Sequence, residues 1–322
     1  MEHTIYNIIS RLSDSLDTSQ LILVEKIIRE ELAEHKKSQI KSNKQLLDGF
    51  VSSKAFESCS EKTIEQYRRE NTKFIESLDK NVCDVHKTDI IKYLSDYKYK
   101  RNVSNVTINN MRRFISAFFN YLEGEDIIPC NPVRKMKALK EEKIIKEPFT
   151  ELEVETLREN ANHTRDKAII DVLNSTGVRV SELCQLNISD IHNGEAIIKG
   201  KGKKERKVYF SSIAINSIKK YLSERDDNNP ALFVNSRSYH GLMSRMSPYS
   251  VEKMLRNLGS NVEISKVHPH KFRRTMATRG MNKGMPIQEM QAILGHSKID
   301  TTMIYCKVNE DNIKTSHRRY VS

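Results

Sequence analysis

The sequence predicts a mainly α-helical fold with a small antiparallel β-hairpin or sheet, organised as two domains behind an N-terminal extension. Apolar residues recur every three or four positions through most of the 322 residues, which is the spacing of helices with one buried face. The spacing becomes strand-like on either side of a glycine- and lysine-rich turn at 200–204. The length allows two separate hydrophobic cores.

Basic residues exceed acidic ones, except near the N-terminus. The chain has 54 lysines and arginines against 42 acids, a net charge of +12, and a pI of about 9.3. Residues 1–40 contain seven acids and five lysines or arginines, a net charge of −2, so the rest carries +14. This balance favours a polyanionic partner, nucleic acid first, bound mainly outside residues 1–40.

Cysteine usage and hydropathy predict a cytoplasmic protein. The five cysteines lack the spacing of a metal site or a disulfide framework, so we expect reduced thiols. No apolar run in the sequence approaches the roughly 20 residues of a membrane span. The start, Met-Glu-His-Thr, lacks the basic region of a signal peptide.

Residues 1–40 are expected to form a helical extension. Apolar spacing predicts helices over 4–16 and 19–34, with Asp17-Thr18-Ser19 as the break between them and the cap of the second. Two amphipathic helices need a partner surface. They either fold onto the neighbouring domain or mediate self-association, and the sequence leaves both interpretations open.

Residues 41–135 are predicted to form a bundle of four helices. The helices are expected at 45–55, 61–78, 89–99 and 105–123. Ser60 is the expected cap of the second helix, and Thr88 or Asp89 that of the third. The second and fourth helices each pair an apolar face with a basic one, which can contact nucleic acid or simply be solvated. The candidate contacts to DNA are Arg68, Arg69, Lys73, Asn109, Arg112 and Arg113.

A charged interdomain linker is predicted at 136–148, and the last domain at 149–322. Thr150 and Glu153 have the spacing of a helix-capping box. Pro286 is expected in the first turn of a helix that stops at Gly295. Strands are expected at 195–199, 205–210 and 231–234. Helices are expected at 150–160, 164–175, 181–186, 211–223, 248–258, 270–283, 286–294 and 298–304.

Five polar residues of the last domain form an ordered set. His270 and Arg273 are three positions apart, which places an imidazole and a guanidinium on one helix face. His296 follows the glycine stop, Tyr305 comes nine residues later, and Arg179 stands upstream at a helix start. Each residue alone fits a solvated surface or, for the tyrosine, a core position. Together they suit an anionic phosphate site with a built-in nucleophile.

Four motifs around these residues carry a family resemblance. They are Gly177-Val178-Arg179-Val180-Ser181-Glu182-Leu183, then Gly200 to Arg206, then His270 to Arg273, and finally Leu294-Gly295-His296-Ser297 with Tyr305. In this order they resemble the first-arginine, lysine-hairpin, second and third boxes of the tyrosine recombinases, or phage integrase family, most closely its Xer-like and transposon-integrase members. The resemblance is strong over 149–307 and rests on pattern over 45–135. Phe272 and Arg274 depart from the usual Leu and His of the second box.

The resemblance implies a core-binding, SAM-like domain followed by a mixed α+β catalytic domain. It implies that Tyr305 is the nucleophile, that Arg179 and Arg273 bind the phosphate, and that His270 and His296 move a proton or donate a hydrogen bond. Lys201 would protonate the leaving oxygen, although Lys199, Lys203 and Lys204 have the same chemistry. Glu182 would brace the Arg179 region. Tyr320 is a rival nucleophile, but its distance from His296 does not fit the family.

The implied reaction is site-specific recombination of double-stranded DNA. The tyrosine forms a 3′-phosphotyrosine and releases a 5′-hydroxyl, which then reverses the step on the partner strand. Bond energy is conserved, so we expect no ATP, metal or other cofactor, no small-molecule substrate and no membrane. Family members act as tetramers that pass a C-terminal segment to a neighbour, and residues 308–322 are long enough for this exchange.

Other functions remain open at this point. A non-catalytic DNA-binding regulator would keep the two domains that hold the duplex but lose the ordered set of active-site residues. A type IB topoisomerase-like enzyme would share the covalent step without strand exchange. A protein-interaction module would explain residues 1–40 but not the four motifs. Within recombination, the sequence does not separate chromosome-dimer resolution from mobile-element integration. The additional N-terminal helices favour a mobile element.

Overall fold

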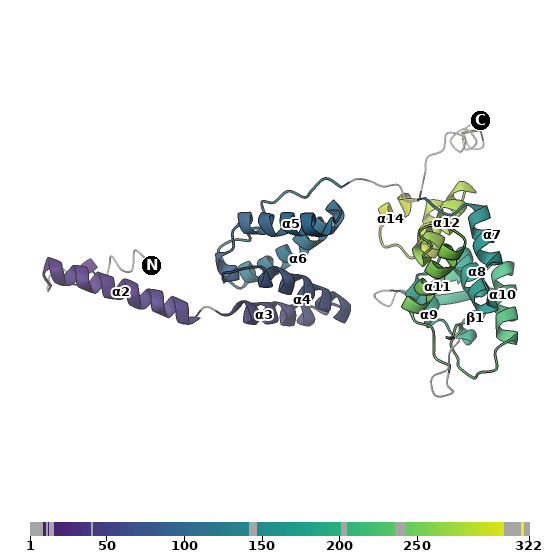
Figure 1. Ribbon diagram of the computed structural model, residues 1–322, viewed down its shortest axis with the longest axis horizontal. Coiled ribbons are helices and arrows are strands. Elements are labelled where there is room, and N and C mark those ends of the chain that lie inside the picture. The colour runs from purple at the N-terminus through teal and green to yellow at the C-terminus, as the bar shows by residue number, and fades with distance from the viewer. Residues whose placement is uncertain are drawn as a thin grey trace. The chain divides into compact units, whose positions relative to one another are not determined.

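The computed structural model describes residues 9–10, 12, 16–39, 41–141, 147–200, 205–235, 243–305 and 317–318, with 29–39 described by their backbone alone. The described part is mostly helical, with a three-stranded antiparallel sheet (Figure 1), which confirms the predicted fold class. The chain separates into two compact units, Met1–Ile144 and Ile145–Ser322.

Helix α2 (Thr18–Gln39) confirms the second helix predicted for the N-terminal extension. It begins where Asp17 and Gln20 exchange hydrogen bonds between each backbone N–H and the other's side-chain oxygen, at 3.0 and 2.9 Å. Ile22, Leu23 and Ile27 are exposed on this helix. The helix predicted at 4–16 lies largely outside the described residues.

The four predicted bundle helices are present as α3 (Asn43–Phe56), α4 (Glu61–Glu76), α5 (Lys87–Arg101) and α6 (Asn105–Gly124). Ser60 accepts from the Thr63 N–H and caps α4, as predicted. The cap predicted for α5 is wrong by two or three positions. His86 is the N-cap residue, because Asp89 lies one turn inside the helix and its carboxylate accepts from the His86 N–H at 2.7 Å.

Aromatic rings form the core of the bundle. Phe50, Phe74, Phe118 and Phe119 are fully buried. Phe50 packs edge-to-face on Tyr67 with ring centroids 5.3 Å apart, and Phe74 packs on Phe119 at 6.1 Å. Edge-to-face packing places the positive edge of one ring on the negative face of the other, which adds to the stabilisation from burial.

The start of the predicted linker is attached to the bundle. Asn109 of α6 is 1% exposed, and its side chain exchanges hydrogen bonds with the backbone of Leu139, at 2.9 Å in both directions. Its amide also donates to Glu141 at 2.7 Å. Arg112 donates to the carbonyl of Met136 at 3.2 Å. Residues 136–141 therefore pack on α6 rather than form a free linker.

The second unit contains the helices predicted for the last domain. They are α7 (Glu151–Glu159), α8 (Thr164–Thr176), α9 (Val180–Gln185), α10 (Ser212–Ser223), α11 (Pro248–Asn261), α12 (Pro269–Asn282), α13 (Ile287–Leu294) and α14 (Asp300–Met303). The predicted capping box at Thr150 and Glu153 opens α7. Helix α8 lies at the centre, with Ala168, Ile169 and Ile170 fully buried.

The sheet consists of β1 (Ile191–His192), β2 (Glu195–Lys199) and β3 (Glu205–Tyr209), in that order. Lys199 pairs with Glu205 across the β2–β3 hairpin, whose turn at 201–204 lies outside the described residues. Ala196, Ile198 and Val208 are buried, whereas Ile197 and Tyr209 are exposed. One face of the sheet thus covers the core of this unit.

Two predictions for this unit are wrong. Residues 231–234 form only isolated bridges, Asn187 with Ala231 and Val234 with Arg245, because this buried apolar run meets different neighbours at its two ends. The third strand is β1 instead. Pro286 is the N-cap of α13 rather than a first-turn residue, because its ψ of 139° is extended.

Cys59, Cys83, Cys130 and Cys184 are free thiols, and burial raises the pKa of Cys184 to about 11. No helix among the described residues combines the length and the apolar character that crossing a bilayer requires.

Candidate active site

Gly177 shapes the turn that presents Arg179. Helix α8 ends at this glycine, whose φ is +59°. A Cβ there would lie 2.3 Å from the Met276 side chain, so both the backbone angle and the packing favour glycine. Val178 is buried, and Arg179 is then the N-cap residue of α9 with its side chain 43% exposed. A long cation is thereby held at the surface beside a rigid turn.

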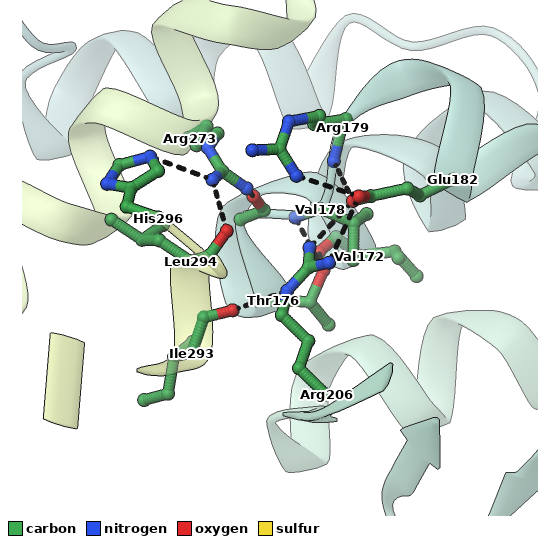
Figure 2. A network of polar contacts seen from close by, with 11 residues as sticks. Val172, Thr176, Val178, Arg179, Glu182, Arg206, Arg273, Ile293, Leu294 and His296 are labelled. Carbon is green, nitrogen blue, oxygen red and sulfur yellow. Dashed lines mark hydrogen bonds and ion pairs between the residues drawn. The ribbon is translucent and has the colours of Figure 1, made fainter. Parts of the chain in front are cut away.

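Glu182 fixes Arg179 in place. Its carboxylate accepts from the backbone N–H of Arg179 at 2.8 Å and from Nη1 at 2.9 Å (Figure 2). Burial alone would raise the pKa of Glu182, but hydrogen bonds from Arg206 and Arg179 and the charge of Arg206 outweigh it and lower this pKa. The bracing role expected of Glu182 is confirmed by these contacts.

Arg206 is the other partner of Glu182. Its Nη1 and Nη2 donate to the two carboxylate oxygens at 3.0 and 2.7 Å, and both side chains are less than a tenth exposed. Its Nε donates to the carbonyl of Ile293 at 2.8 Å, at the end of α13. Arg206 belongs to the hairpin motif, but the sequence predicted no role for it. Strand alternation gives the missing signal, because Arg206 shares its strand face with buried Val208.

Arg273 lies at the base of the cluster. It is 2% exposed, and its Nη1 and Nη2 donate to the carbonyls of Gly177 at 2.6 Å and Leu294 at 2.5 Å. Burial, with the positive charges of Arg179 and Arg206, lowers the pKa of Arg273 to about 10. The guanidinium therefore stays charged at neutral pH, and its plane is fixed by two backbone carbonyls from separate segments.

His296 is held as a neutral hydrogen-bond acceptor. Its Nε2 lies 3.1 Å from Nη2 of Arg273, which can only donate, so the ring proton belongs on Nδ1. Nδ1 lies 2.9 Å from Oγ1 of Thr302, a fully buried residue that the sequence analysis did not select. Burial, followed by the charges of Arg273, Arg179, Arg206 and His270, lowers the pKa of His296 to about 4.

His270 is exposed to solvent, whereas Tyr305 is buried. His270 is exposed in the first turn of α12, one helical turn before Arg273. Tyr305 is 6% exposed, and its ring stacks on that of His296 with centroids 6.2 Å apart and planes 24° apart. The structure therefore brings Arg179, Arg273, His296 and Tyr305 into one region, with the phenol covered. Lys201 and the rival nucleophile Tyr320 lie outside the described residues.

A cavity of about 1000 Å³ opens beside this cluster. Its lining includes Arg179, Gly200, Arg206, Gln291, His296 and Thr301, together with the acidic residue Glu205, from the α8–α9 turn, the end of β2, β3, the end of α13 and α14. Basic and hydrogen-bonding groups thus face a space large enough for a phosphodiester and its neighbouring sugars. The described residues contain no group of three or more His, Cys, Asp or Glu side chains that could hold a metal ion.

The predicted DNA contacts of the bundle have different surroundings. Arg68 pairs with Asp48 at 2.5 Å, and Arg69 and Lys73 pair with Glu70 at 2.9 and 3.2 Å. Arg113 is exposed. The burial of Asn109 corrects the prediction that it contacts DNA, because it is 1% exposed and its side-chain amide is hydrogen-bonded to Leu139 and Glu141. Arg112 is half-buried against the same segment.

Comparison with known proteins follows the same division. Residues 147–312 match the model of the phage integrase family, and residues 46–128 match that of the phage integrase N-terminal SAM-like domain. Tyrosine recombinase XerC of Leptospira interrogans is 32% identical over 275 residues, which cover 81% of this chain and 87% of that protein. Tyrosine recombinase XerA of Pyrococcus horikoshii is 31% identical over 275 residues, 84% of this chain and 92% of that protein.

Solved structures agree in fold. The integrase of transposon Tn1549, in complex with a circular intermediate DNA, has a TM-score of 0.71 at 21% identity, covering 87% of this chain and all of the other. A λ integrase dimer bound to a core site has a TM-score of 0.72 at 17% identity, covering 87% of this chain and 84% of the other.

Proposed function

The chain belongs to the phage integrase family of tyrosine recombinases, site-specific DNA recombinases, and we propose that Tyr305 is the nucleophile with which it cuts and rejoins DNA. The single observation that carries the proposal is the cluster of Arg179, Arg273 and His296 beside Tyr305, in which Arg179 and His296 line a cavity of about 1000 Å³. Two fixed guanidinium groups are suited to a phosphodiester, whose non-bridging oxygens gain charge in the transition state.

Each guanidinium would bind the phosphate in its own way. Arg273 donates three of its five N–H groups, to Gly177, Leu294 and His296. The other two N–H groups have no hydrogen-bond partner among the described residues, which leaves them for a ligand. Arg179 is braced by Glu182 at one nitrogen, and its exposed remainder faces the cavity. Because these contacts exist before DNA binds, little reorganisation is needed when charge develops on the phosphate.

The histidines differ in the roles that suit them. His296 is a poor base, because its pKa is lowered to about 4 and its Nε2 already accepts from Arg273. It is suited to orienting Arg273 and the phosphate. His270, exposed and on the same helix face as Arg273, is the better candidate for accepting the phenol proton.

In the proposed step, the Tyr305 oxygen attacks phosphorus, and the bond from phosphorus to the 5′ oxygen breaks. Lys201 protonates that oxygen, which leaves as a 5′-hydroxyl, and the 3′-phosphotyrosine keeps the bond energy for rejoining. Attack requires the segment 300–305 to shift when DNA binds, since the phenol is covered in the structure described here. No cofactor is invoked for this exchange of one phosphodiester for another.

The assembly and the biological setting belong to the same proposal. We propose that a homotetramer forms on two recombination sites, with residues 308–322 exchanged between neighbours, and that the protein acts in the cytoplasm. Contacts from Arg68, Arg69, Lys73 and Arg113 would add affinity for the duplex. Integration of a mobile element is favoured over dimer resolution by the additional helix α2.

Covalent trapping tests the proposal. DNA flanking the gene is nicked close to the candidate crossover, so that cleavage releases a short fragment and rejoining fails. The wild-type chain should form a protein–DNA adduct that survives denaturation, and Tyr305→Phe should form none while binding the same DNA within about twofold, because only the phenol oxygen is lost. Specific binding by wild type without any adduct would contradict the proposed reaction.

An adduct of undiminished yield with Tyr305→Phe would instead assign the nucleophile to another residue. Tyr320→Phe serves as the matched control, since it removes the rival phenol and should leave the yield unchanged. Relaxation of a supercoiled plasmid that lacks any specific site would identify a topoisomerase rather than a recombinase.

A further inference from the structure

Arg206 joins three separate segments of the catalytic unit. It stands on β3, binds Glu182 of α9 through two nitrogens, and binds the Ile293 carbonyl of α13 through its Nε (Figure 2). It also passes across Gly295, where an added Cβ would lie only 2.8 Å from its Cδ. The glycine at the end of α13 therefore admits the Arg206 side chain next to His296.

Stability alone does not explain this arrangement. Burying an ion pair costs desolvation of both charges, and a buried pair is often no better for stability than well-packed apolar residues. The inward position on β3 could hold an apolar residue like Val208, two residues along the strand. The arginine instead fixes the relative position of three elements. Its planar group makes three hydrogen bonds that hold β3 against α9 and against the end of α13.

The position of Arg206 on β3 connects these contacts to the reaction. β3 begins at Glu205, the first residue after the turn at 201–204 that carries Lys201. Lys199 and Glu205, which flank the turn, make only a 4.0 Å contact and are more than half exposed. In the described part of the hairpin, Arg206 and its cross-strand partner Ile198 are the buried side chains nearest to the turn, and of the two Arg206 makes the polar contacts.

We propose that Arg206 is a positioning residue for strand cleavage: its contacts with Glu182 and Ile293 hold β3 at the cavity, and through β3 they support the delivery of a proton to the leaving oxygen. This inference rests on the proposed function, in which Lys201 supplies that proton. Although Arg206 lines the cavity, its Nε, Nη1 and Nη2 already donate to protein groups, so the proposed role runs through β3 and not through a contact with DNA.

The test distinguishes a loss of proton delivery from every other cause of slower cleavage. Single-turnover cleavage is measured with saturating protein on two nicked DNAs, one ordinary and one with sulfur in place of the bridging 5′ oxygen. In both, the tyrosine oxygen attacks phosphorus, and the bond to the bridging atom breaks. Thiols ionise near pH 8.5, about five units or more below an alcohol, so the sulfur departs as a thiolate without a proton.

The variants are Arg206→Met and Arg206→Lys, with Arg225→Met as matched control. Arg225 is also a buried arginine paired with a carboxylate, Asp227, and it binds the backbone at 229–232 rather than the site. Melting and DNA-binding measurements on each variant establish the folded, bound fraction to which the rates refer.

Arg206→Met should slow cleavage of ordinary DNA by on the order of a hundredfold, as loss of a general acid does. On the sulfur-containing DNA the loss should fall below about tenfold, and Arg225→Met should stay near the wild-type rate on both. Arg206→Lys should lie between, because an ammonium cannot form the paired contact with Glu182.

Two results would overturn the inference. An equal loss of rate on both DNAs would mean that Arg206 acts on the phosphate-binding residues Arg179 and Arg273 or on folding, not on proton delivery. An unchanged rate on ordinary DNA would mean that Arg206 positions nothing. Failure of the wild-type chain to cleave either DNA is a different result, since it would refute the proposed function itself.

Discussion

The two compact units use their charged side chains in opposite ways. In the bundle, Arg68 and Asp48 form a pair in which both side chains are almost half exposed, and Arg69 is more than half exposed beside Glu70. In the catalytic unit, Arg206 and Glu182 are less than a tenth exposed, and Arg273 is 2% exposed. The bundle pairs lie in solvent, where ion pairs are weak and screened by salt. In the catalytic unit, Arg206 and Arg273 are each held by several hydrogen bonds.

The difference teaches what each unit can contribute. Exposed cations can exchange a carboxylate for a DNA phosphate at little cost, and so they supply affinity that depends on salt. Buried guanidinium groups have fixed planes and cannot rearrange cheaply, so they supply geometry for a transition state. Substitutions in the bundle should therefore change binding, and substitutions in the catalytic cluster should change the rate at saturation.

The largest effect is expected at Arg273. Arg273→Ala and Arg273→Lys should each lower the single-turnover cleavage rate by roughly 10²–10³-fold, because a donor to the developing charge is lost and lysine lacks the planar fork. Cleavage is measured on nicked DNA at saturating protein, with melting curves to correct for unfolded chains. Near-wild-type rates in both variants would break the contrast, since the buried cluster would then be structural only.

Asn109→Ala should affect stability more than binding. Asn109 is 1% exposed, and loss of its hydrogen bonds to Leu139 and Glu141, one of them to a carboxylate, should lower the free energy of unfolding by about 1–3 kcal/mol. Urea denaturation followed by circular dichroism measures this loss. DNA affinity, measured on the folded fraction, should change little. A strong loss of affinity with unchanged stability would instead restore the predicted DNA contact.

Arg69→Ala should weaken DNA binding only a few-fold. If Arg69 contacts one phosphate, the slope of log affinity against log salt should decrease by about 0.9, and the cleavage rate at saturation should not change. Lys54→Ala is the control, because it removes the same charge at a position with no predicted contact. Equal effects of the two variants would show that only total charge matters, not a specific face.

The remaining prediction concerns pH and His296. Its pKa in the folded chain, about 4, lies below the usual 6.5, so the unfolded chain takes up a proton first as the pH falls. Stability due to this residue is therefore present above pH 6.5 and is lost between about 6.5 and 4. His296→Gln should reduce the fall in urea midpoint over this window. An identical fall in both proteins would mean that His296 is not shifted as its burial indicates.

Local signals in the sequence determined much of this protein. Apolar periodicity predicted the bundle helices, and the capping residues Ser60, Thr150 and Glu153 placed two helix starts. Gly295 ended α13 in the left-handed conformation, as expected of a glycine stop. These features depend on neighbours within four residues, which is why they can be read without the fold.

Some local signals were present but were not used. Asn193 and Gly194 have φ angles of 50° and 78°, and an Asn-Gly pair between short strands is the usual sign of a two-residue hairpin. It would have predicted β1 in place of the strand at 231–234. The alternation along β3 would likewise have placed Arg206 on the buried face beside Val208.

The composition of the candidate site was determined by the sequence, because ordered motifs specify which side chains are available. Only the tertiary structure decided how they meet. Arg206, Glu182 and Ile293 come from three elements up to 111 positions apart, and their contact depends on packing that no local pattern encodes. The same packing half-buries His296 beside arginines and buries Asn109 against residues 139–141. Burial and charge from distant segments set the pKa and the partners of a side chain, and these exist only once the chain has folded.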